Sequence, residues 1–148
     1  MKDDGRAAVT GGPRLEPAAL EDGGSFVRSA GLVVDEVTST KVSGHIDVGA
    51  DHHTPWGIVH GGVYTTAVES AASIGASAAV RDKGQVAVGL TNTTHFLRSL
   101  VEGYVEVEAV ALHQGRTHQL WRVDLRDAAG QLVAHGELRL QNVAARPT

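Results

Sequence analysis

The sequence predicts an α+β domain in which one curved antiparallel sheet of six strands wraps around a single central helix. Only one long stretch, residues 61–80, has helical character, and it is rich in Ala, Ser, Thr and Gly. Two strand-like segments precede this stretch and four follow it. One helix cannot cover both faces of a flat sheet, but a curved sheet can enclose a helix that carries small side chains.

Apolar and polar residues alternate in the expected strands, which is the pattern of a sheet with one buried face. Val42, Ile46 and Val48 share one side of their segment. Val105 and Val107 likewise alternate with acidic residues. The expected strands are residues 31–37, 42–48, 85–96, 104–113, 121–126 and 137–141, with a hairpin turn at residues 127–130.

The central helix is expected to begin at Gly61 and to end near Gly84. Gly84 suits a helix C-cap, and Arg81 and Lys83 precede it where the helix dipole favours cations. A curved sheet around one helix is the arrangement of a hotdog fold. The outer face and the edges of the sheet are expected to need a partner, which predicts a dimer or a larger homo-oligomer.

The 148 residues suffice for one domain with one core. We expect a disordered N-terminal tail at residues 1–15, a single hotdog domain at residues 16–143 and a short tail at residues 144–148. Within the domain, residues 17–22 are expected to form a short helix and residues 26–29 a turn.

Composition and charge exclude several classes of protein. The net charge of −4 and the absence of a Lys/Arg cluster argue against nucleic-acid binding. Residues 1–12 lack the apolar core of a secretory signal, and the charge-poor run at residues 63–80 is interrupted by Glu69, so we expect no membrane span. The chain has no Cys, which suits a reducing cytoplasm.

Glu69 is the leading catalytic candidate, because it is the only charged residue between Gly61 and Val80. Burying a carboxylate costs free energy unless it is hydrogen-bonded or protonated, so a carboxylate among apolar residues often marks a functional cleft. The alternative is a solvent-facing stripe that Glu69 shares with uncharged polar residues. That stripe would consist of Thr65, Thr66, Ser70 and Ser73.

The segment His60-Gly61-Gly62 stands at the expected start of the helix. Glycines let a ligand approach the backbone closely, and the free N–H groups of a helix start favour an oxyanion or a phosphate. The alternative reading is a plain turn followed by a helix. The position of Glu69 further along the same helix favours the functional reading.

Two segments resemble a known family. Residues 56–70 (WGIVHGGVYTTAVES) are similar to the signature of hotdog thioesterases, in the phenylacetate-pathway and Glu-type 4-hydroxybenzoyl-CoA branch. That signature is Gly, two residues, His-Gly-Gly, six residues, then Asp or Glu. Residues 92–99 (NTTHFLRS) resemble the family strand that ends in Phe-Leu-Arg-Pro. The resemblance covers roughly residues 25 to 143.

The resemblance implies hydrolysis of an acyl-CoA thioester without a metal or an organic cofactor, coenzyme A being part of the substrate. Glu69 would act as general base or as nucleophile, and Gly61 N–H would polarise the thioester carbonyl. His60 would shape the loop, and Ser73 would orient water or the carboxylate. Family members carry Asn or Gln six residues before the His; Thr54 stands there in this chain, with His52 and His53 as alternatives for that contact.

Helix geometry adds an expectation of its own. Gly61 and Glu69 are eight residues apart, or about 12 Å along a helix axis at about 1.5 Å per residue. A base and an oxyanion donor must both lie within about 3 Å of the reacting atoms. We therefore predict that Glu69 of one subunit faces Gly61 of the other in a homodimer, and the family resemblance suggests a dimer of dimers.

Further residues are expected to bind the substrate. The turn at residues 113–118 could hold a phosphate or the adenine edge of coenzyme A, although a simple basic hairpin tip is the alternative. Whichever side of the strand at residues 92–95 faces the helix is expected to line the pantetheine channel. With six large aromatic residues in the chain, a pocket built mainly of aromatics is not expected. The expected binding residues are Gly62, Trp56, Asn92, Thr93, Thr94, Gly115, Arg116 and Thr117.

Other functions stay open at this point. Asp51, His52 and His53 with His60 form the only metal-like cluster, but its spacing is poor for ligation, so no metal is expected. A hotdog dehydratase or hydratase of 3-hydroxyacyl thioesters is an alternative in which His53 would act. A non-catalytic acyl-CoA-binding module is another, against which the lone carboxylate of Glu69 argues. A purely structural oligomer is a third, and release of free thiol from any acyl-CoA would distinguish both from an enzyme.

Overall fold

A computed structural model describes residue 8, residues 10–13 and residues 24–146 of the chain. Its elements occur in the predicted order of two strands, one long helix and four strands. They are α2 (Gly24–Ala30), β1 (Val33–Val37), β2 (Lys41–Val48), η1 (Ala50–His52), α3 (Gly61–Val80), η2 (Arg81–Lys83), β3 (Gln85–Phe96), β4 (Gly103–Gln114), β5 (His118–Asp127) and β6 (Leu132–Ala144).

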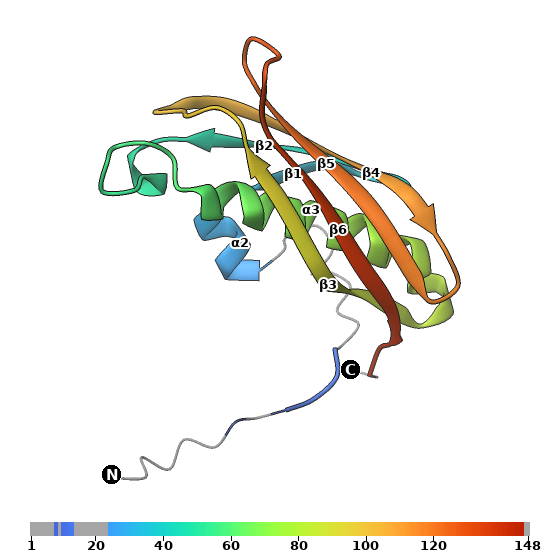
Figure 1. The fold of residues 1–148 in the computed structure, drawn as a ribbon. Helices are drawn as coiled ribbons and strands as arrows, with labels where there is room; N and C mark the ends of the chain where they lie inside the picture. Colours follow the sequence, from blue (N-terminus) through green and yellow to red (C-terminus); the bar gives the residue numbers. More distant parts are fainter. Residues whose placement is uncertain (1–7, 9, 14–23, 147–148) are drawn as a thin grey trace, which may run out of the picture.

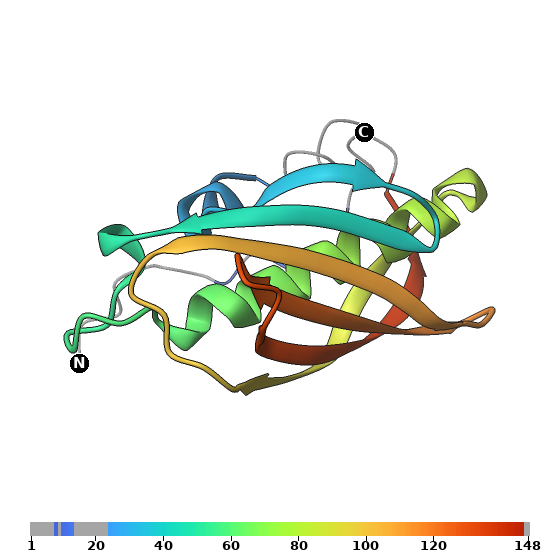
Figure 2. The ribbon, with the colours of Figure 1, turned by 90° about the horizontal axis from the view of Figure 1, so that it is seen from above.

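The six strands form one antiparallel sheet in the order β1-β2-β4-β5-β6-β3. The sheet curves around α3, which lies along its concave face (Figures 1 and 2). The prediction of a hotdog fold is therefore confirmed. Strands β1 and β3 are the two edges, and the short helix α2 lies beside the first half of α3 (Figure 1).

Small residues on α3 let the sheet close on the helix. Ala67, Ala71 and Ala72 are buried against the strands. Gly75 is required because a Cβ atom there would overlap the ring of Trp121, which is fully buried on β5. The helix ends at Val80, and Gly84 closes the following 3-10 turn with a left-handed φ of 68°, as expected for its role as a cap.

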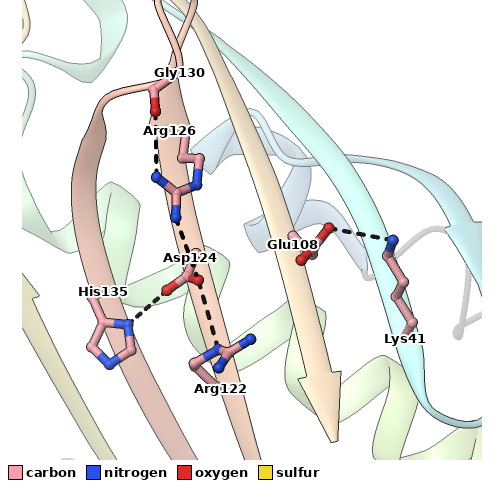
Figure 3. Close-up of polar contacts among 7 residues, drawn as sticks. All are labelled: Lys41, Glu108, Arg122, Asp124, Arg126, Gly130 and His135. Atoms are coloured by element: carbon pink, nitrogen blue, oxygen red, sulfur yellow. Dashed lines mark hydrogen bonds and ion pairs between the residues drawn. The ribbon is translucent and has the colours of Figure 1, made fainter.

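The outer face of the sheet is charged rather than apolar. Asp124 on β5 accepts a hydrogen bond from His135 Nδ1 at 2.7 Å and lies 3.6 Å from Arg122 Nε and 3.9 Å from Arg126 Nη2 (Figure 3). Lys41 pairs with Glu108 at 3.3 Å on the neighbouring strands. Paired charges can remain in water, and the expectation that this face needs a partner stays a prediction.

The same expectation was made for the edges of the sheet, and it applies to the edge strand β3. Val88 and Leu90 are exposed along it, and Phe96 and Leu97 are exposed at its end. An exposed strand edge with apolar side chains favours pairing with another strand. The exposed apolar side chains of this edge are in keeping with the expected oligomer.

The ends of the chain differ in part from expectation. Residues 26–29, expected as a turn, belong to helix α2. The expected helix at residues 17–22 lies outside the described residues. Within the tail expected at residues 1–15, Pro13 O accepts a hydrogen bond of 2.8 Å from Arg146 N–H. In the described part of the chain, every helix is too short or too polar to span a membrane.

Candidate active site

The first turn of α3 is capped by a histidine. His60 Nδ1 accepts a hydrogen bond of 2.8 Å from Gly62 N–H, so this ring nitrogen carries no proton in that contact. A Cβ atom on Gly62 would approach His60 Nδ1 to 2.8 Å, and one on Gly61 would approach the Phe96 ring to the same distance. Glycine at both positions therefore allows the close approach of the His60 and Phe96 side chains to the start of α3.

Gly61 N–H is left open by this cap. Among the described residues, no hydrogen-bond acceptor lies opposite Gly61 N–H. Gly61 lines a cavity of about 330 Å³ whose walls are mostly apolar. The lining residues are Thr54, Trp56, Ile58, Val59, Gly61, Tyr64, Phe96, Leu97, Arg98 and Ser99. A free N–H at a helix start beside an apolar cavity can donate to the carbonyl oxygen of an ester or thioester.

Glu69 lies half-buried in a second cavity, of about 310 Å³. Its described lining residues are Phe26, Thr65, Thr66, Glu69, Ser70 and Asn92, and Glu69 is the only charged one. Asn92 Nδ2 donates to Glu69 Oε2 at 3.1 Å and also to Thr65 O at 3.1 Å. The carboxylate is therefore held by β3 and faces a cavity with a mainly apolar lining, and three residues of the expected stripe, Thr65, Thr66 and Ser70, form part of its wall.

Gly89 on β3 makes room for the carboxylate. A Cβ atom at this position would overlap Glu69 Oε1. The register of β3 against β6 shifts between Gly89 and Thr91, so Leu90 is an extra residue in the strand. Both Gly89 and Asn92 face α3 as a result.

The two cavities share no lining residue. Gly61 belongs to one and Glu69 to the other, which agrees with the separation predicted from helix geometry. Within one chain, the Glu69 carboxylate and the free Gly61 N–H do not meet in the same cavity.

Tyr64 lies between α3 and the sheet and lines the Gly61 cavity. Its side chain is only 3% exposed, and its hydroxyl has no hydrogen-bond partner among the described residues. Burial raises the pKa of Tyr64 above its ordinary value, because the phenolate form loses its hydration. The group therefore stays a neutral hydroxyl at physiological pH.

The other residues expected to be catalytic lie near these cavities. Thr54 lines the Gly61 cavity, but its Oγ1 accepts a hydrogen bond of 3.2 Å from Trp56 N–H in its own turn. Ser73 is half-buried one turn beyond Glu69 and is not among the described lining residues of either cavity. Trp56 is 83% exposed at the rim of the Gly61 cavity, so it does not pack into the core.

The expected binding residues divide between two regions. Asn92 and Thr94 face α3, whereas Thr93 lies on the opposite side of β3. Residues 115–117 form the tip of the β4–β5 hairpin, near the end of α3 that lies away from Gly61 (Figures 1 and 2). Asn142 Nδ2 holds this tip by donating to Gly115 O and Arg116 O at 3.2 Å each.

The histidines of the loop before α3 have structural partners. His52 Nδ1 accepts from Gly49 N–H at 3.1 Å, and His53 Nε2 donates to Val101 O at 2.6 Å. Among the described residues, no three His, Asp or Glu side chains gather as metal ligands.

Sequence reasoning missed how aromatic residues would gather. Phe26 lines the Glu69 cavity and is 72% exposed, and three more of the six large aromatics line the Gly61 cavity. These three are Trp56, Tyr64 and Phe96. A local signal for this clustering is lacking, because the four residues come from α2, a loop, α3 and β3.

The fold and the site define a hotdog-fold protein with a carboxylate and a free helix-start N–H. The thioesterase superfamily matches residues 57–134, and the chain belongs to this family. It is thus an enzyme of the thioester-hydrolase class.

Individual relatives agree with this class. A protein of Mycobacterium tuberculosis (strain H37Rv), to which an esterase activity is ascribed, is 39% identical over 88% of this chain and 95% of its own length. Its solved structure has a TM-score of 0.79, with 82% of this chain and 98% of that chain covered. The 1,4-dihydroxy-2-naphthoyl-CoA hydrolase of Listeria monocytogenes is 31% identical over 70% of this chain and 83% of its own length.

Proposed function

We propose that this enzyme hydrolyses acyl-CoA thioesters whose acyl group is aromatic, releasing a free carboxylic acid and coenzyme A. The observation that carries the proposal is Glu69, the single carboxylate among the described residues that line its cavity, held there by Asn92. An aromatic acyl group is favoured by Phe26, Trp56 and Phe96, whose exposed rings line the two cavities. The Listeria relative, named as a naphthoyl-CoA hydrolase, points in the same direction.

In the proposed reaction, Gly61 N–H donates to the thioester carbonyl oxygen and stabilises the negative charge that develops there. If Glu69 acts as a base, it takes a proton from water while the water oxygen bonds to the carbonyl carbon. The C–S bond then breaks, and the proton passes to the departing thiolate of coenzyme A. If Glu69 acts as a nucleophile, its oxygen forms an anhydride with the acyl group and releases the thiolate, and water then hydrolyses the anhydride.

We propose that the active site is shared between subunits. Glu69 of one subunit would face Gly61 of the other across a dimer formed along the exposed edge of β3. The separate cavities around these two residues support this arrangement. We further propose that two such dimers form a tetramer and that the enzyme acts in the cytoplasm, in keeping with the absence of Cys.

The Glu69 residue also supports the Glu-type branch of the family, because branches differ in whether Asp or Glu stands at this position. Within this proposal, Gly62, Thr94 and the hairpin tip at residues 115–117 are substrate-binding elements. Arg116 is exposed at the tip and is suited to a phosphate of coenzyme A.

The experiment that tests the proposal is a thiol-release assay over a panel of aryl- and alkyl-CoA thioesters. We expect the wild type to prefer aryl-CoA, and Glu69→Gln to lose about a hundredfold or more in kcat, the size of a general acid–base effect. Glu36→Gln, which changes an exposed carboxylate on β1, is the matched control and is expected to keep full activity. Absence of thiol release by the wild type, or an active Glu69→Gln variant, would contradict the proposal.

A further inference from the structure

An irregularity in β3 brings Asn92 to the carboxylate of Glu69. In a regular strand, residues 89 and 92 would point to opposite faces, because side chains alternate with a period of two. The extra residue Leu90 shifts the register, so that Gly89, Asn92 and Thr94 all face α3. Such a bulge re-aims the side chains that follow it.

The contacts of Asn92 determine the orientation of its amide. Nδ2 lies 3.1 Å from Thr65 O, a carbonyl that can only accept, and 3.1 Å from Glu69 Oε2. On the other side, Thr94 Oγ1 donates to Asn92 Oδ1 at 2.7 Å. Both amide hydrogens are therefore used, and the amide oxygen receives a hydroxyl hydrogen. A flipped amide would place its oxygen opposite Thr65 O and Glu69 Oε2 and would lose both of those hydrogen bonds.

Because both of its amide hydrogens are already bonded, Asn92 differs from a residue that binds substrate. A side chain amide has two hydrogens, and those of Asn92 go to the backbone of α3 and to Glu69. Neither is left for the pantetheine arm of a thioester. The chain of hydrogen bonds from Thr94 through Asn92 instead ends on the one charged group among the described lining residues of this cavity.

We propose that Asn92 is a positioning residue for the reaction, which holds Glu69 Oε2 so that the carboxylate presents a fixed orientation to the substrate, and that Thr94 fixes the amide of Asn92. This inference rests on the proposed catalytic role of Glu69. The hydrogen bond to a carboxylate is charge-assisted and stronger than a neutral one.

The kinetic test compares Asn92→Ala and Thr94→Val with the conservative variant Thr94→Ser. For Asn92→Ala we expect kcat to fall about tenfold to a hundredfold, the range for one charge-assisted hydrogen bond, with KM within about threefold of the wild type. Thr94→Val is expected to show a smaller loss that Thr94→Ser restores.

The control variant is Thr91→Val, the same chemical change as Thr94→Val on the same strand but at an exposed residue beside the bulge. It is expected to keep the kcat and KM of the wild type. A raised KM with unchanged kcat in Asn92→Ala would overturn the proposal and return Asn92 to the substrate-binding residues. A loss in Thr94→Val that Thr94→Ser does not restore, or an Asn92→Ala variant with the kcat of the wild type, would also overturn it.

A second measurement does not depend on turnover. The chain contains only two Asn, Asn92 and Asn142, so ¹⁵N-asparagine labelling gives two side-chain amide signals. We expect the Asn92 amide signals to shift in Glu69→Gln relative to the wild type, because Asn92 Nδ2 donates to Glu69 Oε2, while the Asn142 signals stay unchanged. If the wild type releases no thiol, the proposed function fails, but the NMR measurement still tests whether Asn92 contacts Glu69. Asn92 signals that ignore Glu69→Gln would overturn the positioning role.

Discussion

Gly89 faces Glu69 where β3 packs on α3, and a Cβ atom there would overlap Glu69 Oε1. The conformation of Gly89 is not the reason for glycine, since its φ is not in the left-handed region. The requirement is space for a carboxylate. At the scale of single residues, Glu69 Oε1 can occupy its position only because residue 89 of β3 has no side chain.

We predict that Gly89→Ala lowers kcat/KM by on the order of a hundredfold, because a displacement of about 1 Å at a reacting group has an effect of that size. Thiol release measures the loss, and a thermal melt reports whether the fold persists. Gly49→Ala is the matched control, since Gly49 has an extended backbone and no atoms lie within 4 Å of an added Cβ. Equal activity of the two variants would show that the carboxylate needs no such space.

Tyr64 carries a buried hydroxyl without a partner among the described residues, which is a cost to the folded state. A buried unsatisfied polar group costs about 1–3 kcal/mol. We therefore predict that Tyr64→Phe raises the free energy of unfolding by about 1 kcal/mol at pH 7, as measured by urea denaturation. A decrease would mean that the hydroxyl has a partner, such as a buried water.

The same residue predicts a dependence on pH. Burial raises the pKa of Tyr64 in the folded chain, whereas in the unfolded chain tyrosine ionises at about pH 10. The unfolded state therefore loses its proton first, and the contribution of Tyr64 to stability falls as pH rises above about 10. The advantage of Tyr64→Phe over the wild type should grow between pH 9 and pH 11. Tyr104→Phe, at an exposed residue of β4, is the control.

At the scale of elements, the start of α3 combines a cap with the proposed oxyanion donor. His60 Nδ1 satisfies Gly62 N–H and leaves Gly61 N–H open. A serine or aspartate could cap the same helix, so the cap alone does not require histidine. Phe96, at the end of β3, packs against Gly61. This contact limits how closely the start of α3 approaches the edge strand.

We predict that His60→Ala lowers the free energy of unfolding by about 0.5–2 kcal/mol, the range for loss of an N-cap. It should also lower kcat, because an uncapped Gly62 frees the first turn to move. His60→Asn keeps a short-range acceptor and is expected to recover most of the stability. Urea denaturation and thiol release measure the two effects, and a fully stable His60→Ala variant would contradict the role of the cap.

At the scale of the whole molecule, the shared active site makes a prediction about mixed dimers. Glu69→Gln disables the carboxylate, and Gly61→Val would push the helix start away from Phe96. Each homodimer should be inactive. In a mixed dimer, one site receives both substitutions and the other receives none, because the two sites are related by the dimer axis.

Statistical reassociation makes half of the dimers mixed, each with one intact site of two, so we expect about a quarter of the wild-type activity. The measurement is thiol release after the two variants are co-refolded, with each variant refolded alone as control. Absence of recovery, with mixed dimers verified by mass, would place Glu69 and Gly61 of one site in the same subunit.

The sequence by itself determined the order of the elements, the bounds of β1 to β4 to within two residues and the leading site candidates, whereas β5 and β6 extend beyond the predicted residues 121–126 and 137–141. Strand β3 was predicted at residues 85–96 and is found there. Alternation in strands and the run of small residues in α3 are local patterns, and they follow directly from the periods of the two structures. Glu69 and the glycines at residues 61–62 stood out for the same reason, as exceptions within a local pattern.

Only the tertiary structure decided what those residues contact. The bulge at Leu90 turns Asn92 toward Glu69. The residue pattern of β3 does not indicate that the strand contains an extra residue. The charged outer face was likewise missed, because Asp124 and His135 are paired across two strands. The gathering of aromatic side chains at the cavities also depends on packing. Such contacts join residues distant in sequence, and their energies arise only when the curved sheet closes on α3.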